Sequence, residues 1–263
     1  MKKIVSLLLL TLFLGNLSAQ ESNQADLIDG NNLVKLSLSS LLFGRYSLEY
    51  ERVLSKKLSV GLAYSIRPEK ALPFKSKVLD IIDDDEVSNL LTDFKSSSRS
   101  FTPEFRFYLG KKGYGNGFYI APYAKFSTFN LQTPYFYDVA IEVGGVPVYD
   151  REESIDLEGK VTAFTAGVSF GFNIKVAKGL YLDWRVLGPG YGSAKGDISG
   201  NMALNQDEQD GLNEQLSNLQ ESLEDMPLKI KMDYTVNGQG AAIKVTNSPW
   251  ANLRSGISLA YRF

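Results

Sequence analysis

Apolar and polar residues alternate along several stretches of this chain, and this period of two constrains the fold more than any other feature of the sequence. The final seven residues show it clearly, because apolar or aromatic residues alternate there with small or charged ones. The apolar members are Ile257, Leu259, Tyr261 and Phe263. A strand of this pattern has one face for lipid and one for a polar interior, which indicates a transmembrane β-barrel.

The same four residues resemble the terminal signal that the outer-membrane assembly machinery reads. They therefore predict a bacterial outer-membrane location. The expected partners are the barrel assembly machinery, outer-membrane lipid and lipopolysaccharide.

The first residues predict a signal peptide that is cleaved on export. Two lysines precede an apolar run from Ile4 to Leu14, and the small residue Ala19 ends the segment. The apolar run is about half of the ~20 residues that a membrane-spanning helix needs. We expect a signal peptide at 1–19, a short segment at 20–31 and a barrel domain at 32–263. Only helices and closed barrels satisfy their backbone groups in lipid, and no other stretch is apolar enough for a spanning helix.

Eight alternating stretches predict an all-β fold, an antiparallel up-and-down transmembrane barrel. They begin near Asn32, Arg45, Leu58, Ser100, Phe118, Phe164, Leu180 and Leu253. Eight strands of about ten residues match the smallest outer-membrane barrels. A Gly-Gly turn between Val139 and Asp150, and the Asn237-Gly238 pair, mark two further hairpins, so ten strands stay possible.

The connections alternate between short turns and long loops, as between the periplasmic and cell-surface ends of such a barrel. Apolar residues recur at helical spacing in two of the long loops, from Val78 to Phe94 and from Leu212 to Leu223, which predicts short helices there. The acidic stretch 205–210 suits the first turn of the second helix. The glycine-rich stretch 188–192 is interpreted as a bend that leaves the barrel.

Charged residues fall on the strand faces opposite the apolar ones, and we expect them to form a network in the lumen. The network comprises Arg45, Glu49, Glu51, Glu104, Arg106, Lys125, Asp183 and Arg185, and Arg254 and Arg262 share the same face. An eight-stranded barrel is about wide enough for its own side chains or for one small ligand. Because an unpaired buried charge is unfavourable, a salt-bridged filling is favoured over a narrow polar conduit, and acid–base catalysis by Glu49 and Glu104 is less favoured still.

The composition excludes several kinds of site. The chain has no cysteine and no histidine, which removes thiol chemistry and the usual general base and metal ligand. A net charge of −2 does not favour a nucleic-acid partner. The acidic run 83–86 lacks the ligand spacing of a calcium loop and suits a solvated helix face. We therefore expect no catalytic, cofactor-binding or metal site and no enzyme activity.

Four stretches together resemble a known family. They are 48–52, 100–108, 182–192 and the closing 261–263, within a likeness that runs from about Asn32 to Phe263. They are similar to small outer-membrane β-barrel proteins of Bacteroidota-type bacteria, a family classed as a domain of unknown function. The resemblance implies a barrel fold and an outer-membrane location, and it implies no reaction.

Three functions remain compatible with the sequence. The first is a structural or surface-interaction barrel with a side-chain-filled lumen. The second is a narrow channel for ions or small solutes. The third is an outer-membrane enzyme, which the absence of histidine makes the least favoured. A secreted, lipocalin-like barrel is an alternative fold, in which Phe101, Phe105 and Phe107 would line a pocket for one small hydrophobic ligand. Small residues on the polar face, such as Gly61 and Gly171, favour a polar face that points into a tight lumen.

Overall fold

The computed structural model describes residues 30–72, 75–80, 84–143, 146–226 and 229–263. The expected signal peptide and nearly all of the segment 20–31 lie outside these residues. The strands are β1 (Asn32–Ser37), β2 (Tyr46–Val53), β3 (Leu58–Ala71), β4 (Lys95–Tyr108), β5 (Gly117–Val143), β6 (Val146–Ala177), β7 (Leu180–Leu187), β8 (Pro189–Asn201), β9 (Met232–Asn237), β10 (Gly240–Leu253) and β11 (Gly256–Arg262). The helices are α2 (Leu38–Leu42), α3 (Lys75–Leu79), α4 (Asp85–Thr92) and α5 (Gln206–Asp225).

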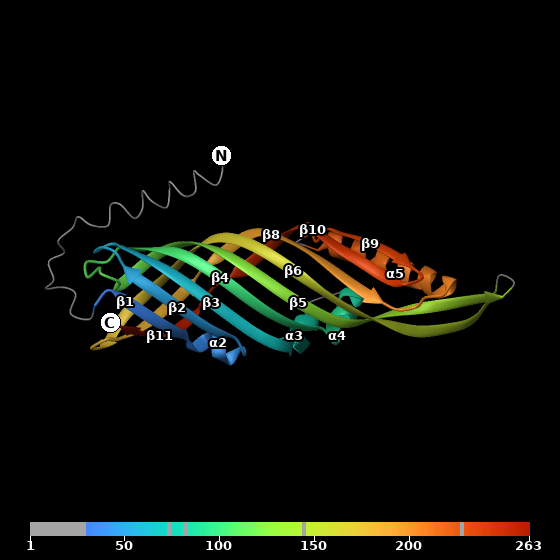
Figure 1. Cartoon of the computed structure of the whole chain (residues 1–263), viewed down its shortest axis with the longest axis horizontal. Coiled ribbons are helices and arrows are strands. Elements are labelled where there is room, and N and C mark those ends of the chain that lie inside the picture. The colour runs from blue at the N-terminus through green and yellow to red at the C-terminus, as the bar shows by residue number, and fades with distance from the viewer. Residues whose placement is uncertain (1–29, 73–74, 81–83, 144–145, 227–228) are drawn as a thin grey trace.

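Eight of the described strands close into an antiparallel ring, as the sequence predicts. The ring runs from β1 through β7 in chain order and returns through β11 to β1. The closing pair is in register from Leu33 opposite Arg262 to Ser37 opposite Ser258. Residue 30 and the C-terminal end of β11 therefore lie side by side at one end of the barrel (Figure 1).

The remaining strands prolong one side of the barrel beyond its other end. β5 and β6 form a continuous hairpin from Gly117 opposite Asn173 to Val143 opposite Val146. β8 and β10 continue β7 and β11, and β9 pairs with β10 at the edge of this extension (Figure 1). Neither additional hairpin enters the ring, so the ten-stranded alternative is not realised.

The interpretation of 188–192 as a bend that leaves the barrel is wrong. β8 begins at Pro189, immediately after β7 ends, and both strands pair with the same neighbour, β6. The ladder shifts by one residue near Phe170 and then continues from Gly167 opposite Gly190. Gly190 leaves room for the Tyr123 side chain, which points inward from β5, because a Cβ at Gly190 would lie 3.2 Å from Cζ of Tyr123.

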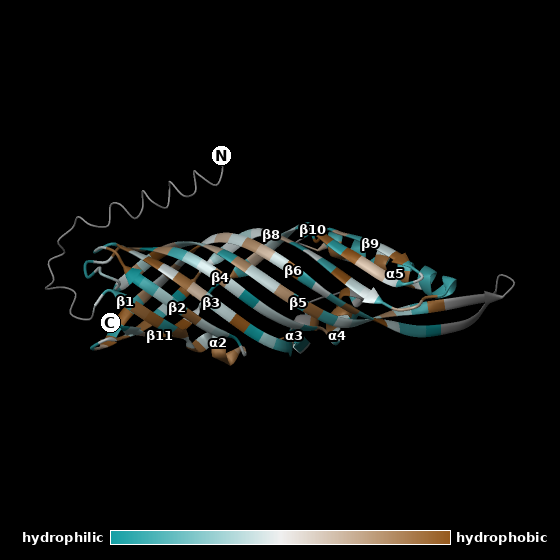
Figure 2. Ribbon diagram, in the orientation of Figure 1, coloured by the Kyte–Doolittle hydropathy of each residue, from teal (hydrophilic) through white to brown (hydrophobic). Residues whose placement is uncertain are grey.

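The apolar faces of the ring strands point outward. Phe101, Phe105 and Phe107 are 44%, 44% and 45% exposed, and residues of this kind recur on all eight strands of the ring. In Figure 2 hydrophobic residues alternate with hydrophilic ones along the ring strands. The lipocalin-like alternative is therefore wrong, because the phenylalanines lie on the outer surface of a transmembrane barrel and not in an internal pocket.

Helix α5 lies against the extension and gives it a hydrophobic core of its own. Its buried face consists of Leu212, Leu216, Leu219 and Leu223, at the spacing predicted for a helix. These residues pack with Tyr135 of β5 and Leu157 of β6, among others. A reciprocal pair of hydrogen bonds between Asn205 and Glu208 caps the helix at its start. Of the described helices, none is long and apolar enough to cross a membrane.

Candidate functional site

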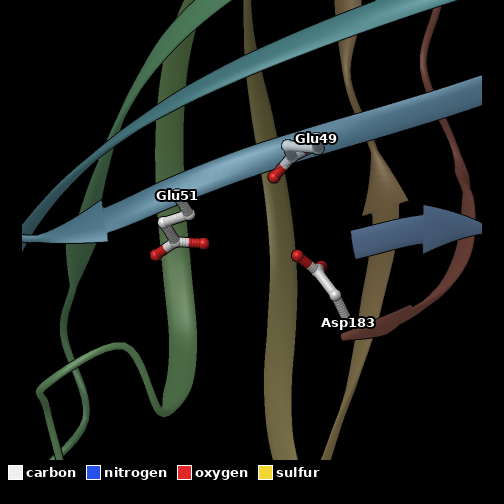
Figure 3. A group of neighbouring side chains, drawn as sticks. All are labelled: Glu49, Glu51 and Asp183. Carbon is white, nitrogen blue, oxygen red and sulfur yellow. The ribbon is translucent and has the colours of Figure 1, made fainter. Parts of the chain in front are cut away.

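A layer of buried ion pairs crosses the lumen within the ring, and Lys35 of β1 lies at its centre. The Lys35 Nζ atom is 2.5 Å from Glu51 Oε2 and 3.3 Å from Glu49 Oε1, and it also donates a hydrogen bond to Asp183. Glu49 and Glu51 project inward from β2, and Asp183 reaches toward them from β7 on another part of the wall (Figure 3).

Arg106 of β4 is the second cation of this layer, and it is fully buried. Its Nε atom donates to Glu104 Oε1 at 2.6 Å, and its Nη1 atom is 3.1 Å from Glu51 Oε2. The guanidinium also donates to Glu49 and Asp183. One side chain thus holds carboxylates from three strands, which only the closed ring brings together.

Two further arginines complete the layer on the side away from the termini. Arg185 Nη2 lies 2.9 Å from Glu104 Oε1 and 3.3 Å from Glu49 Oε2. Arg254 Nη1 lies 2.7 Å from Glu104 Oε2. The layer therefore joins four cations to four carboxylates, and this balance is the condition under which buried charges are tolerated.

Tyrosines fill the space around the ion pairs. Tyr108 donates to Glu51 at 2.7 Å, and Tyr119 donates to Asp183 Oδ1 at 2.8 Å. The Arg106 guanidinium also lies 4.3 Å from the centre of the Tyr119 ring. Room for Tyr119 comes from Gly171 on β6, where an added Cβ would lie 2.5 Å from the Tyr119 Cζ atom.

A second group of side chains closes the lumen nearer to the chain termini than the ion pairs do. Leu33, Val53, Tyr181 and Ala260 form a buried cluster there. Arg262 extends across it and donates to the Gly30 and Tyr114 carbonyl oxygens at 2.8 and 2.6 Å. The barrel is thus filled by side chains at two levels.

Six of the eight residues that the sequence placed in the lumen network lie together in this layer. The other two, Arg45 and Lys125, point into the lumen farther from the termini and contact a separate cavity. Sequence reasoning missed Lys35, although it lies on the inward face of the first alternating stretch. It also missed the roles of Tyr108 and Tyr119, whose partners depend on the register between strands.

The residues of the expected assembly signal lie on the outer face of β11 and just beyond it. Ile257, Leu259, Tyr261 and Phe263 are all exposed, and the Tyr261 and Phe263 rings stack with centroids 6.1 Å apart. Their recognition by an assembly machinery stays a prediction.

Three carboxylates of the layer are close enough together to invite comparison with a metal site. Oxygen atoms of Glu49, Glu51 and Asp183 lie within 4.8 Å of one another. The Lys35 ammonium group occupies the point at which they converge and supplies the positive charge that a cation would bring. The residues present therefore fit an internal ion-pair layer better than a metal centre.

No protein-family model and no curated protein matches the sequence. Among solved structures, the chain is similar to CarO2 of Acinetobacter baumannii, with a TM-score of 0.41 and 11% identity over 89% of this chain and 97% of that one. It is also similar to the N-terminal β-barrel domain of Pseudomonas aeruginosa OprF, with a TM-score of 0.29 and 8% identity over 89% and 98%. These likenesses are distant, and they add no support for an origin in Bacteroidota-type bacteria.

Proposed function

We propose that this protein is a bacterial outer-membrane barrel with a closed lumen, which anchors the extension formed by β8, β9, β10, the distal β5–β6 hairpin and α5 at the cell surface. The observation that carries this proposal is the ion-pair layer, in which Lys35 and Arg106 are buried against four carboxylates. A lumen occupied in this way suits an anchor better than a channel.

The closed lumen is supported by two independent closures. A solute that enters from the end away from the termini would meet the ion-pair layer first and the cluster around Leu33 and Tyr181 next. Passage would separate buried partners at each level, and breaking one buried ion pair leaves an uncompensated charge that is strongly unfavourable.

The surface role is supported by the construction of the extension. α5 buries four leucines against β-strands that reach beyond the ring, so the extension has a core separate from the lumen. Tyr135 also donates to the Gln215 carbonyl oxygen at 3.0 Å, and Arg151 bonds to Glu208 at 3.1 Å. A packed extension presents a defined surface to other molecules, whereas a long unstructured loop would not.

The lipid partners follow from the outward face of the ring. A row of outward aromatic residues, Tyr64, Phe101, Phe126 and Phe164, crosses β3 to β6 in register. The next outward row, farther from the termini, contains Arg99 and Lys195. Aromatic residues within the lipid-facing band, followed by basic residues at its edge, suit the phosphate groups of lipopolysaccharide in an outer leaflet.

Two experiments test the proposal. The first compares membrane fractions on a gel before and after boiling, since a closed barrel that resists detergent migrates faster when unheated. The second measures currents across planar bilayers that contain the purified protein. We expect a shift on boiling in the outer-membrane fraction and no stepwise conductance. Regular conductance steps at low voltage would favour the narrow channel and contradict the closed lumen.

A third experiment tests the orientation. Protease added to intact cells should cleave in the extension but not in the turns at the terminal end, such as 110–116. A tag in that turn and a tag after residue 226 provide the matched comparison. Cleavage at the terminal end alone would reverse the proposed orientation.

A further inference from the structure

A cavity of about 120 Å³ lies in the lumen next to the ion-pair layer, on the side away from the termini. It is bordered by α2 and by the junction between β10 and β11, which contribute Ser40 and Ser255. A single water molecule needs only ~10–15 Å³ of such volume. The cavity therefore has room for a small polyatomic ligand with part of its hydration.

The wall of this cavity is strongly biased toward positive charge. Among the described residues that line it, five are cationic and one is a carboxylate. The cations are Lys35, Arg45, Lys125, Arg185 and Arg254, and the carboxylate is Glu49. Glu49 is already held by Lys35, Arg106 and Arg185, so the excess positive charge in the cavity is not neutralised by it.

Arg45 and Lys125 carry this excess. Within the part of the chain that the structure describes, neither side chain has an ion pair or a side-chain hydrogen bond, although both are half-buried. The charged groups that act on Lys125 are Arg45 and Arg254, and the one that acts on Arg45 is Arg67, so all of them are cations. Like charges in a partly desolvated lumen repel each other, and a bound anion would relieve that repulsion.

Hydroxyl groups supply the remaining donors. Ser47, Ser65 and Ser100 lie opposite one another across β2, β3 and β4, one inward position farther from the termini than Glu49. Ser37 and Ser258 form a similar pair across β1 and β11. Ammonium, guanidinium and hydroxyl donors around one space are the groups that bind oxygen acceptors with negative charge.

We propose that this cavity binds a small anion with several oxygen atoms, such as phosphate or a small carboxylate, through Arg45, Lys125 and the surrounding serines. The ion-pair layer forms the floor of the site, so the anion is held and not passed through. This site goes beyond the anchoring role, and a closed lumen without a bound anion would leave that role intact. The anion is a free solute, because the site lies inside the ring and the lipid-facing surface lies outside it.

The test is a calorimetric titration of the full-length barrel, in a detergent without phosphate, with inorganic phosphate at constant ionic strength. We expect saturable binding that Lys125→Met and Arg45→Gln each weaken roughly tenfold, the loss of one charge-assisted hydrogen bond. The matched controls, Lys57→Met and Arg52→Gln, remove exposed basic residues that do not line the cavity and should bind as the wild type does. No saturable binding, or equal binding by all four variants, would overturn the proposal.

A second measurement needs no variant and covers the case in which a lumen substitution prevents folding. In nuclear magnetic resonance spectra of the wild-type barrel, phosphate should shift the backbone amides of Ser47, Ser65 and Ser100, and chloride at the same ionic strength should not. Equal shifts with chloride would show that the amides respond to ionic strength and not to a bound oxyanion, which would contradict the proposal. Shifts confined to Arg99 and Lys195, or binding of short-chain phosphatidic acid but not of inorganic phosphate, would move the ligand to the lipid surface and contradict the proposal.

Discussion

Arg106 and Glu104 form an ion pair within a single strand, with 2.6 Å between Nε and Oε1, and both side chains are buried. Residues two apart on a strand share a face, so β4 places both groups in the lumen. The pair is then locked from the opposite walls, where Asp183 contacts Arg106 and Arg254 contacts Glu104. Stability of the barrel should therefore depend on each member of the layer more than on exposed charges.

Arg106→Met should destabilise the barrel strongly. The change leaves Glu49, Glu51, Glu104 and Asp183 with three cations, and removing one partner of a buried ion pair costs about 3–5 kcal/mol. Denaturant unfolding of the barrel in lipid vesicles would measure the loss. Arg99→Met, an exposed arginine on the same strand, is the control and should stay within about 0.5 kcal/mol. Equal stability of the two variants would show that the layer does not hold the barrel together.

The composition of this layer could be predicted from the sequence, but its pairing could not. Alternation alone places Glu49, Arg106 and Asp183 on inward faces. Which of them meet depends on ring closure and on the register of strands that are far apart in the chain: Lys35 and Asp183 are separated by 148 positions. Register across a closed sheet is set by all strands together, so local patterns do not reveal it.

The extension was harder to predict for a different physical reason. Gly188 and Pro189 are local signals for a turn, yet β6 runs on past the end of β7, and β8 pairs with it there after a shift of one residue. A long neighbouring strand thus overrides the local preference. The α5 helix was predictable, because the spacing of Leu212, Leu216, Leu219 and Leu223 needs no tertiary information.

Gly171→Val should disturb the ion-pair layer by displacing Tyr119. A Cβ at Gly171 would lie 2.5 Å from Tyr119 Cζ and 2.6 Å from the Trp184 carbonyl oxygen, so Tyr119 could not keep its hydrogen bond to Asp183. Overpacking of this kind typically costs 1–3 kcal/mol, about the amount expected here. The unfolding free energy would be compared with that of Ala166→Val, an exposed position on the same strand. An unchanged free energy of unfolding for Gly171→Val would mean that the lumen has unfilled space next to Tyr119.

Leu62→Arg should identify the middle of the lipid-facing band. Leu62 is 41% exposed and lies midway along the outward residues of β3, from Leu58 to Ile66. Arginine on the lipid face costs about 2–4 kcal/mol at the midplane of the bilayer and about 0–1 kcal/mol near its edge. Leu109→Arg, just after the end of β4, should therefore be nearly neutral. The free energy of unfolding in lipid vesicles would be measured for both variants. Equal losses of stability would mean that Leu62 does not lie at the middle of the lipid-facing band.

Leu216→Ala should loosen the extension and leave the ring intact. Leu216 is fully buried in the core that α5 shares with the distal parts of β5 and β6, and that core does not include the residues of the ion-pair layer. A buried leucine replaced by alanine costs about 2–5 kcal/mol. Local opening of the extension should then raise the rate of protease cleavage within 205–226 roughly tenfold or more. The temperature at which the boiled form appears on a gel should stay unchanged.

Glu214→Ala, on the exposed face of the same helix, is the control and should alter neither quantity. A fall in the temperature of the gel shift for Leu216→Ala would contradict this independence, because it would show that the extension and the ring unfold as one cooperative unit.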